Sequence, residues 1–467
     1  MGSVNDHMQP MSATGINMLI VGAGIGGLSL AIEAHRKGHT VRIIEKRAEL
    51  SALGDTIALE SSAIRTMLRS WPGFAERAAA VCIDPGYNFY AENGDYLGTY
   101  SMGDPDLPPI LAHRIEYHHL LYDYLRELGI EVELGKACAD YFEEEGYGGV
   151  VLEGGIKITA DVVVAADGVG SSSWKLVVGK PVNAVPSGFA IYRCNFPLGP
   201  ALESSSMLRD RYGQYKTRFE FFLAPHGVLV FSLTPRRMSF MLGHPASLTS
   251  SEKWAGTVDK AECLPFVKGW DPICTEIINA APPDSIIDWN LVWRDPQENW
   301  VSPKGRIVQI GDASHPFLPS AGYGGTQAQE DSMSLPECLR QAGKVNIPLA
   351  LRVHNKLRFE RVACCQRLGF MNRELILNVR RQGSLENLAM IHGDWLYKHD
   401  PEKYAEEEFQ ECASSILMGT PYKVKNSVPG YEYEPWTVEG LMDLAERGVD
   451  LEKIVGGTWR TSKQRQP

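Results

Sequence analysis

A glycine-rich turn near the start of the chain constrains its fold more than any other feature. The turn, Gly22–Gly27, has the sequence Gly-Ala-Gly-Ile-Gly-Gly and follows an apolar segment, residues 16–21, that predicts a β-strand. A helical pattern comes after the glycines, and residues 41–44 predict a second strand. A strand, a glycine turn, a helix and a strand within about thirty residues form a βαβ unit, which predicts a parallel sheet flanked by helices.

The spacing of Gly22, Gly24 and Gly27 is typical of a dinucleotide-binding turn. Such glycines permit a tight turn and let backbone N–H groups approach a pyrophosphate at the N-terminus of the helix, where the helix dipole favours negative charge. Glu45 ends the second strand, at the distance from the turn where an acid accepts hydrogen bonds from an adenosine ribose. We predict that these residues and the adjacent Lys46 bind a dinucleotide. The alternative is a glycine turn that serves only the packing of the helix on the strands.

Composition and charge exclude several other classes of protein. The 467 residues are 44% hydrophobic and 22% charged, as in an ordinary globular protein. A net charge of −11 argues against a nucleic-acid partner, because phosphate binding needs clustered Lys and Arg. The nine cysteines include no C-x-x-C pair and no H-E-x-x-H occurs, so we expect neither a disulfide framework nor a metal site. We expect a soluble, cytoplasmic protein, since we find no secretory signal and no apolar run of about 18 residues.

Three further patterns follow the βαβ unit. Residues 162–166 predict a strand that ends at Asp167-Gly168, and residues 306–310 predict another that ends at Gly311-Asp312. Between them, residues 184–293 contain alternating apolar and polar segments, which predict a separate and largely antiparallel sheet. Beyond residue 350 the pattern is mostly helical.

Together, Gly22–Gly27, Glu45, Arg114, Asp167-Gly168 and Gly311-Asp312 resemble the motifs of the single-component (class A) FAD-dependent aromatic monooxygenases, which have the para-hydroxybenzoate hydroxylase fold. The resemblance extends from about residue 16 to residue 345. It implies FAD as the bound cofactor, NADPH or NADH as a transient reductant, and dioxygen as the source of the inserted oxygen. The alternative within this fold is a protein that keeps FAD as a scaffold and oxygenates nothing.

The segment from Gly311 to Asp331 resembles the family's "GD" motif. By this resemblance Asp312 binds the ribityl chain of FAD. The glycines that open the next helix place backbone N–H donors beside the flavin pyrimidine edge, where they stabilise negative charge on reduced flavin. Thr326 stands where the family usually has Asn. The cofactor-binding residues implied by this motif are Asp312, Pro319, Gly322, Gly324 and Gly325.

Two further cofactor residues are implied by the same resemblance. Asp167 belongs to the "DG" motif, which the family associates with the FAD pyrophosphate and with handling of the reductant. Arg114 matches an arginine that contacts the FAD side of the fold, and the alternative for it is a surface helix cap or ion pair. Trp174 occupies a position where the family usually has Arg, so the sequence does not predict which residues bind the nicotinamide.

The resemblance implies an α/β fold in which a Rossmann-like FAD-binding domain is interleaved with a mainly antiparallel sheet domain for the substrate, followed by C-terminal helices. The expected boundaries are 1–82, 111–183 and 294–348 for the three parts of the FAD-binding domain, 83–110 for a substrate-domain insertion, 184–293 for the substrate-binding sheet and 349–467 for the C-terminal helical region.

Two polar residues, Asp55 and Arg193, are predicted to carry the substrate chemistry. Asp55 lies in Gly54–Leu59, where the family commonly has small residues beside the flavin, and Arg193 lies in a strand that by resemblance faces the substrate. A buried arginine is costly unless it is paired, so we expect these two side chains to form an ion pair. Such a pair would anchor a polar substrate and assist proton delivery. The alternative is a salt bridge that only joins two domains.

The combination of Gly54-Asp55 with Tyr192-Arg193, and segments 395–400 and 404–409, resemble a fungal subgroup that oxidises indole alkaloids. This resemblance implies an electron-rich aromatic natural product as substrate and an indole 2,3-epoxide as product, which can rearrange to a spiro-oxindole. A salicylate- or phenol-type hydroxylase is the alternative. Both a monomer and a homodimer remain open.

Several single residues are weaker candidates for the substrate site. His226 and Tyr192 are acid–base candidates, although lone residues of these types more often belong to a core or a surface. The aromatic side chains that we expect near the substrate, with core packing as the alternative, are Trp289, Trp293, Phe317 and Phe222.

Overall fold

A five-stranded parallel sheet forms the half of the molecule that contains the glycine turn. In the computed structural model its strand order is β19-β12-β1-β2-β8, and every neighbouring pair is parallel. The strands are β1 (Asn17–Val21), β2 (Thr40–Ile44), β8 (Val132–Glu133), β12 (Val162–Ala165) and β19 (Ile307–Gln309). The predicted βαβ unit is confirmed, since α1 (Ile25–Arg36) joins β1 to β2. The structure describes residues 8–50, 54–84, 86–101, 103–181, 184–225, 227–246, 256–382 and 391–460.

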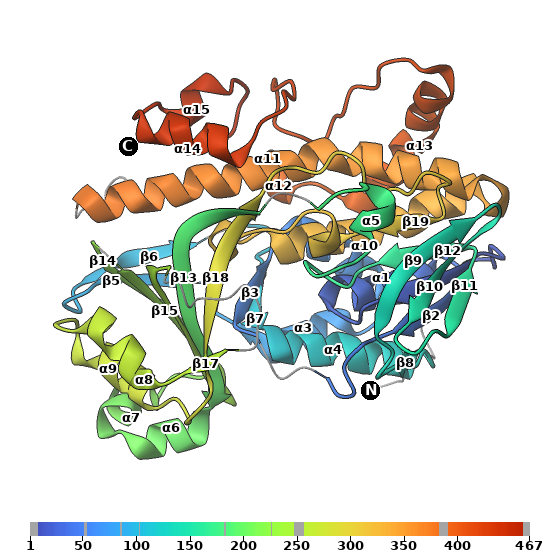
Figure 1. The fold of residues 1–467 in the computed structure, drawn as a ribbon. Coiled ribbons are helices and arrows are strands. Elements are labelled where there is room, and N and C mark those ends of the chain that lie inside the picture. Colours follow the sequence, from blue (N-terminus) through green and yellow to red (C-terminus); the bar gives the residue numbers. More distant parts are fainter. Residues whose placement is uncertain are drawn as a thin grey trace.

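An eight-stranded sheet forms the other half of the molecule (Figure 1). Its order is β17-β18-β13-β16-β15-β14-β5-β6, and its pairs are antiparallel except for β14 with β5. The predicted antiparallel sheet is therefore confirmed, and two earlier strands join its edge. The strands are β5 (Gly86–Ala91), β6 (Tyr96–Ser101), β13 (Ala184–Pro197), β14 (Arg218–Ala224), β15 (Gly227–Leu233), β16 (Arg237–Pro245), β17 (Thr257–Val258) and β18 (Ile286–Arg294).

Two three-stranded antiparallel sheets complete the strands that the structure describes. One, of order β3-β7-β4, leads from the parallel sheet toward the large sheet and contains β3 (Thr56–Leu59), β4 (Cys82–Ile83) and β7 (Ile110–His113). The other, of order β11-β10-β9, packs against the parallel sheet and contains β9 (Cys138–Glu144), β10 (Tyr147–Leu152) and β11 (Lys157–Ala160).

Helices cover the parallel sheet because their apolar faces pack against its apolar side chains. Leu28, Ala31 and Ile32 of α1 are fully buried in a core that α1 shares with α4 (Arg114–Glu127) and α10 (Gly324–Ala342). Short helices pack against one face of the large sheet, which leaves its other face toward the middle of the molecule (Figure 1). These are α6 (Leu198–Ser204), α7 (Ser206–Tyr212), α8 (Lys260–Cys263) and α9 (Pro272–Asn279), and the smaller helices near the parallel sheet are α2 (Ser61–Ser70), α3 (Phe74–Val81) and α5 (Trp174–Val177).

A single long helix, α11 (Ile347–Gln382), runs across both halves of the molecule (Figure 1). Its first turns pack on α10 in the core of the parallel-sheet half, and Phe370 farther along contacts Trp293 of β18. The C-terminal helices α12 (Asp394–Tyr397), α13 (Pro401–Met418), α14 (Val438–Glu446) and α15 (Leu451–Ile454) lie against it. The expected fold class, an α/β fold with a mainly antiparallel second sheet and C-terminal helices, is confirmed.

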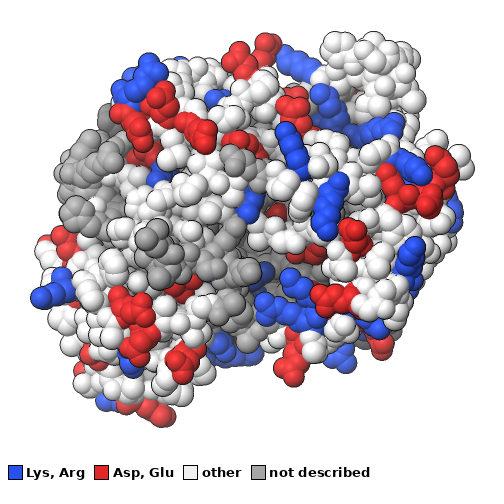
Figure 2. Space-filling view, viewed as in Figure 1, with Lys and Arg blue, Asp and Glu red and all other residues white. Residues whose placement is uncertain are grey.

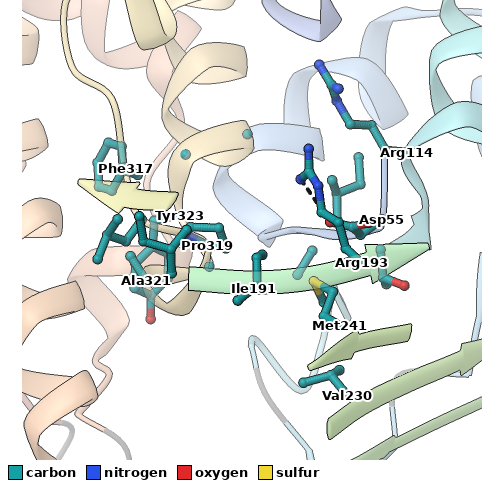
Figure 3. Close-up of a pocket in the computed structure, with 18 of the residues that line it drawn as sticks. Asp55, Arg114, Ile191, Arg193, Val230, Met241, Phe317, Pro319, Ala321 and Tyr323 are labelled. Atoms are coloured by element: carbon teal, nitrogen blue, oxygen red, sulfur yellow. Dashed lines mark hydrogen bonds and ion pairs between the residues drawn. The ribbon is translucent and has the colours of Figure 1, made fainter. Parts of the chain in front are cut away.

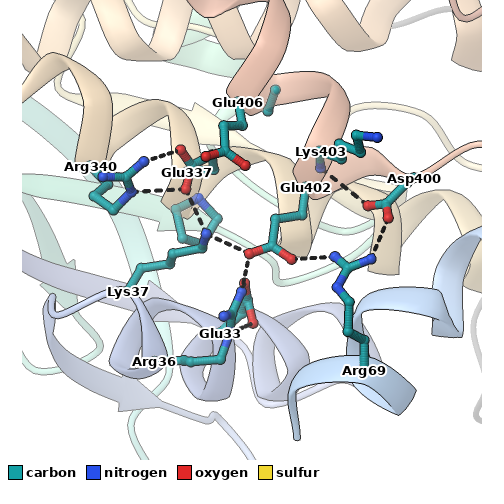
Figure 4. A network of polar contacts seen from close by, with 12 residues as sticks. Glu33, Arg36, Lys37, Arg69, Glu337, Arg340, Asp400, Glu402, Lys403 and Glu406 are labelled. Carbon is teal, nitrogen blue, oxygen red and sulfur yellow. Dashed lines mark hydrogen bonds and ion pairs between the residues drawn. The ribbon is translucent and has the colours of Figure 1, made fainter. Parts of the chain in front are cut away.

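A buried network of charges attaches α13 to the end of α1 (Figure 4). The carboxylate of Glu402 forms ion pairs with Arg36 and with Lys37, the latter at 2.5 Å, and a third with Arg69 of α2 at 2.7 Å. Lys37 also pairs with Glu337 of α10 at 2.6 Å. Burial alone raises the pKa of Glu402, but Arg36 and Lys37 outweigh it and hold this pKa at about 2. The network therefore needs Glu402 in its ionised form.

This network predicts a specific loss of stability in acid. The pKa of Glu402 is lower in the folded state than its ordinary value of 4.5, so its contribution is complete above pH 4.5 and is lost as pH falls toward about 2. Urea unfolding of Glu402→Gln is expected to show a free energy of unfolding up to about 3 kcal/mol below wild type near neutral pH, with the difference shrinking below pH 4.5. Glu407→Gln on the same helix is the control, because the Glu407–Lys403 pair is exposed. A constant difference from neutral to acid pH would contradict this account.

Charges of both signs are mixed over the face of the molecule seen in Figure 2. Exposed pairs one helical turn apart, such as Asp394 with Lys398 and Asp443 with Arg447, contribute little stability. Among the helices that the structure describes, none combines the length and the apolar character needed to cross a membrane.

Candidate active site

A cavity of about 580 Å³ lies between the parallel sheet and the large sheet. Its size is that of a binding site for a small organic molecule. Backbone from the glycine turn, from β3 and from the start of α10 lines one side, and side chains of β13, β14, β15 and β18 line the other. The predicted site residues that line it are Gly24, Asp55, Arg114, Arg193, Asp312, Pro319, Gly322, Gly324 and Gly325.

The three glycines of the turn have different local surroundings. A Cβ on Gly22 would lie 2.5 Å from the carbonyl oxygen of Ala166, and one on Gly27 would lie 2.0 Å from the carbonyl oxygen of Gly22. Both positions therefore need glycine for close packing of turn, strand and helix. A Cβ on Gly24 would meet no protein atom within 4 Å, and Gly24 lines the cavity. The space at Gly24 is thus open to a ligand, as expected for the glycine that lets a pyrophosphate approach the backbone.

Glu45 and Lys46 do not line the large cavity. The carboxylate of Glu45 accepts hydrogen bonds from the backbone N–H of Ala23 at 2.9 Å and of Arg47 at 2.9 Å. It therefore holds the glycine turn in place, and a carboxylate has further lone pairs for a ribose hydroxyl. His118 of α4 contacts the carbonyl oxygen of Ala23 at 2.6 Å, and no sequence motif pointed to it. Lys46 is exposed.

Asp312 and the glycines after it lie where the end of β19 meets the start of α10. Burial raises the pKa of the Asp312 carboxyl, while His315 and Arg114 act in the opposite direction. Gly322 has φ +71°, which favours glycine, and α10 begins two residues later. The first N–H groups of a helix have no partner within the helix, so this end of α10 offers donors and a favourable dipole toward the cavity. Thr326 is buried, and its Oγ1 accepts the backbone N–H of Glu60 at 3.1 Å.

Buried ion pairs between α10 and α11 hold α10 in place. Arg361 of α11 donates to both carboxylate oxygens of Glu330, at 2.7 and 2.8 Å, and Arg358 pairs with Glu330 and, at 2.9 Å, with Asp331. Asp331 in turn accepts the backbone N–H of Gly311 at 3.0 Å. Burial raises the pKa of Glu330, but the two arginines together hold it well below its usual range. The sequence motif included Glu330 and Asp331, but their arginine partners lie beyond the recognised segment.

Asp167 and Arg114 are the two remaining cofactor residues that the resemblance implies. Asp167 does not line the large cavity, and its Oδ2 accepts the hydroxyl of Tyr141 at 2.8 Å. Burial raises the pKa of Asp167, and hydrogen bonds from Ser171 and Tyr141 oppose this. Arg114 begins α4 and lines the cavity, where Asp312 and Asp55 offset part of the cost of its burial. The alternative of a surface cap does not fit this half-buried position of Arg114 on the cavity wall.

Asp55 and Arg193 form the expected ion pair at the centre of the cavity wall (Figure 3). The Arg193 guanidinium donates to Oδ2 of Asp55 at 3.0 Å, and its central carbon lies 4.4 Å from the ring centre of Trp289. Burial raises the pKa of Asp55, and Arg193 and Arg114 offset part of this rise. Burial also lowers the pKa of Arg193. Burial thus acts against the charge on each group, and the ion pair offsets part of that cost.

The rest of the cavity wall is apolar and aromatic. Trp289 and Phe317 line it as expected, whereas Phe222 and Trp293 pack in the core outside it. Tyr192 also points away from the cavity, and its ring stacks on His244 at 3.8 Å. His226 lies outside the described residues. The lining residues that the sequence did not identify are Tyr87, Phe89, Phe189, Phe219, Phe221, Met241 and, from α11, Arg373 and Leu377.

Fold and site together define a flavoprotein in which the glycine turn and a largely apolar wall line the same cavity. The space at Gly24 and the helix start at Gly324 fit the pyrophosphate and the pyrimidine edge of FAD. Residues 15–343 match the model of the FAD binding domain family, and the chain belongs to this family.

Comparisons with individual proteins narrow the class further. The chain is 36% identical to FAD-dependent monooxygenase fsr3 of Gibberella fujikuroi, over 96% of this chain and 90% of that protein. It is 35% identical to FAD-dependent monooxygenase mdpD of Emericella nidulans, over 96% and 91% of the two chains. The crystal structure of CtdE in complex with FAD and a substrate superposes with a TM-score of 0.80 at 29% identity, covering 86% of this chain and 100% of CtdE. The protein is an FAD-dependent monooxygenase.

Proposed function

We propose that this monooxygenase uses a nicotinamide and dioxygen to oxygenate an electron-rich aromatic natural product, with epoxidation of an indole 2,3-bond as the leading reaction. The observation that carries the proposal is the Asp55–Arg193 pair, which lies in the same cavity as the start of α10 and an aromatic wall. We place the reaction in fungal alkaloid biosynthesis, with rearrangement of the epoxide to a spiro-oxindole as a following step. The relatives that match most of the chain are fungal monooxygenases, which supports this placement.

The cavity wall supports a flat, largely apolar guest. Phe89 and Phe221 stack with ring centres 4.8 Å apart on the large sheet, and Phe317 also lines the cavity. Such rings bind an aromatic guest by offset or edge-to-face contact and exclude water from it. The bound flavin supplies the activated oxygen, and the protein holds the guest and manages protons.

Asp55 and Arg193 are proposed to manage the proton. Oδ2 of Asp55 accepts the Arg193 hydrogen bond, which leaves Oδ1 as the oxygen that carries a proton. Protonated Asp55 would deliver that proton to the oxygen of the product as the epoxide opens, and Arg193 would hold the resulting carboxylate. The Arg193 guanidinium stacks on the Trp289 ring, and this contact fixes the orientation of the ion pair toward the bound guest.

A salicylate- or phenol-type hydroxylase is the alternative. It has the same cofactor requirement, but its substrate has an acidic hydroxyl group, which a cation in the cavity would recognise. Arg373 lines the cavity and donates to the carbonyl oxygen of Ser187 at 3.3 Å, so this alternative has a specific residue to test.

Product analysis separates the two reactions. Purified protein with FAD, NADPH and heavy-isotope dioxygen is incubated with tetrahydrocarbazole, a minimal indole substituted at both carbons of its 2,3-bond, with prenylated indole alkaloids and with 1-naphthol. We expect a spiro-oxindole that contains one heavy oxygen from an indole and little product from the phenol. A ring-hydroxylated naphthol as the main product would establish the alternative. Unchanged substrates with no NADPH consumption would refute oxygenation of either class.

A further inference from the structure

A second, smaller cavity lies directly behind the Asp55–Arg193 pair. Its volume is about 40 Å³, and the pair lines both this cavity and the large one. The ion pair is therefore the partition between the guest cavity and a small polar chamber. The other lining residues of the chamber are Gly54, Cys194, Asn195, Ser285 and Ile287.

The amide of Asn195 is oriented toward this chamber by Arg237. The Arg237 guanidinium donates to Oδ1 of Asn195 and, at 3.0 Å, to its backbone carbonyl oxygen. Because Oδ1 is engaged, Nδ2 must point the other way. Nδ2 is buried and has no hydrogen-bond partner among the residues that the structure describes. A buried N–H donor without a partner costs free energy, so an acceptor inside the chamber would stabilise Nδ2 of Asn195.

The outer end of the chamber approaches solvent at Ser285. This residue is half-buried in the turn before β18, and its hydroxyl donates to the carbonyl oxygen of Pro282 at 2.6 Å. The same hydroxyl oxygen lies 3.1 Å from Sγ of Cys194. The chamber therefore has a donor at Asn195, an acceptor at Asp55 and a hydroxyl that is both, which is the partner set that one buried water requires.

We infer that the chamber binds an ordered water that connects Asp55 to solvent through Ser285 and returns a proton to Asp55 in each turnover. The water accepts a hydrogen bond from Nδ2 of Asn195 and donates to Asp55. After Asp55 has given its proton to the product, the Ser285 hydroxyl turns from the Pro282 carbonyl oxygen toward the water. The water then passes one proton to the carboxylate as it takes one from Ser285. Ser285 takes a proton from solvent in the same concerted step, so no alkoxide forms and Asp55 gains one proton from solvent. The spiro-oxindole is an isomer of the epoxide, so the product gives up one proton to solvent as its carbonyl group forms, and the number of protons balances. This inference rests on the proposed proton role of Asp55.

The arrangement gives the proton a path that does not pass through the guest cavity. Most residues that line the guest side of the pair are apolar or aromatic, which limits water there while a reactive oxygen is handled. A proton that entered from that side would bring water with it. A proton that enters from behind β13 reaches Asp55 without bringing water into the guest cavity.

The first test looks for the water and its effect on Asp55 without turnover. A high-resolution crystal structure of the FAD-loaded protein should show a water within hydrogen-bond distance of Asn195 Nδ2 and Asp55. Infrared titration of the Asp55 carboxyl, identified by its loss in Asp55→Asn, should give a higher pKa in Asn195→Leu by about one unit, because the carboxylate loses the water that the amide holds. An empty chamber and an unchanged pKa would overturn the inference.

The second test uses turnover of tetrahydrocarbazole. Ser285→Ala is expected to slow turnover about tenfold and to increase the solvent deuterium isotope effect, and Ser285→Thr should restore both because it keeps the hydroxyl. Ser204→Ala is the matched control, since its hydroxyl also donates to a carbonyl three residues earlier, at 2.8 Å, and lies outside both cavities. If Asp55→Asn lowers turnover but Ser285→Ala does not, the path is wrong and the role of Asp55 stands. If Asp55→Asn itself has no effect, the proposed role of Asp55 fails first.

Discussion

Replacing Arg193 by methionine is expected to lower the turnover of tetrahydrocarbazole at least about 100-fold while the purified protein keeps its bound FAD. Methionine fills a similar volume against Trp289 but cannot pair with Asp55, so the carboxylate loses the group that holds its charge. The residues around the glycine turn and Asp312 are unchanged, which is why the cofactor should remain. Steady-state rates and the visible absorbance of bound flavin give the two readouts.

A double variant separates catalysis from structure at this pair. Breaking one partner of a buried ion pair typically costs about 3–5 kcal/mol because a lone charge is left behind. Asp55→Asn combined with Arg193→Met buries no lone charge, so its stability should recover relative to Arg193→Met. Its turnover should stay low, because neither the proton carrier nor its partner is present. Recovery of both stability and turnover would mean that the pair is only a bridge between the two halves.

Alanine at Gly27 is expected to give a colourless protein, whereas alanine at Gly24 should give a folded protein that binds FAD weakly. The added methyl at Gly27 would lie 2.0 Å from the carbonyl oxygen of Gly22, so the turn must distort. Such overpacking costs about 1–3 kcal/mol and also displaces the N–H groups that face the pyrophosphate. The methyl at Gly24 meets no protein atom within 4 Å and projects where the ligand belongs.

Two measurements distinguish these glycine variants. Urea unfolding of the FAD-free proteins should leave Gly24→Ala within about 0.5 kcal/mol of wild type and place Gly27→Ala clearly below it. Titration with FAD should show an affinity at least about tenfold weaker for Gly24→Ala. Equal affinity of Gly24→Ala and wild type for FAD would show that the cofactor does not approach the backbone at this turn.

The cofactor side of the site could be predicted well from sequence because its requirements are local. Gly22, Gly24 and Gly27 are needed within one turn, and Asp312 follows directly on a strand, so neighbouring residues carry the whole signal. The Asp55–Arg193 pair was predictable for another reason. The family resemblance placed Asp55 beside the flavin and Arg193 on a strand that faces the substrate, and a buried arginine is costly unless it is paired.

The guest side was predicted less well because it depends on which face of each strand turns inward. Phe219, Phe221 and Leu223 alternate along β14 and line the cavity, so Phe222 must face the other side of the sheet. Tyr192 faces away from the cavity in the same manner, because its neighbour Arg193 lines it. Alternation alone does not say which of the two faces is inside. Tyr87 and Phe89 were missed because their strand joins the large sheet from more than 120 positions earlier in the chain, beside Phe221.

The long helix α11 contributes residues both to the cofactor side of the site and to the guest cavity. Arg358 and Arg361 near one end secure the helix that faces the cofactor, and Arg373 borders the guest cavity. At about 1.5 Å of rise per residue, Arg358 and Arg373 are roughly 22 Å apart on a single continuous helix. Substitutions near Arg373 can therefore change which molecules the cavity admits. The ion pairs of Arg358 and Arg361, and with them the cofactor site, are not affected by such changes.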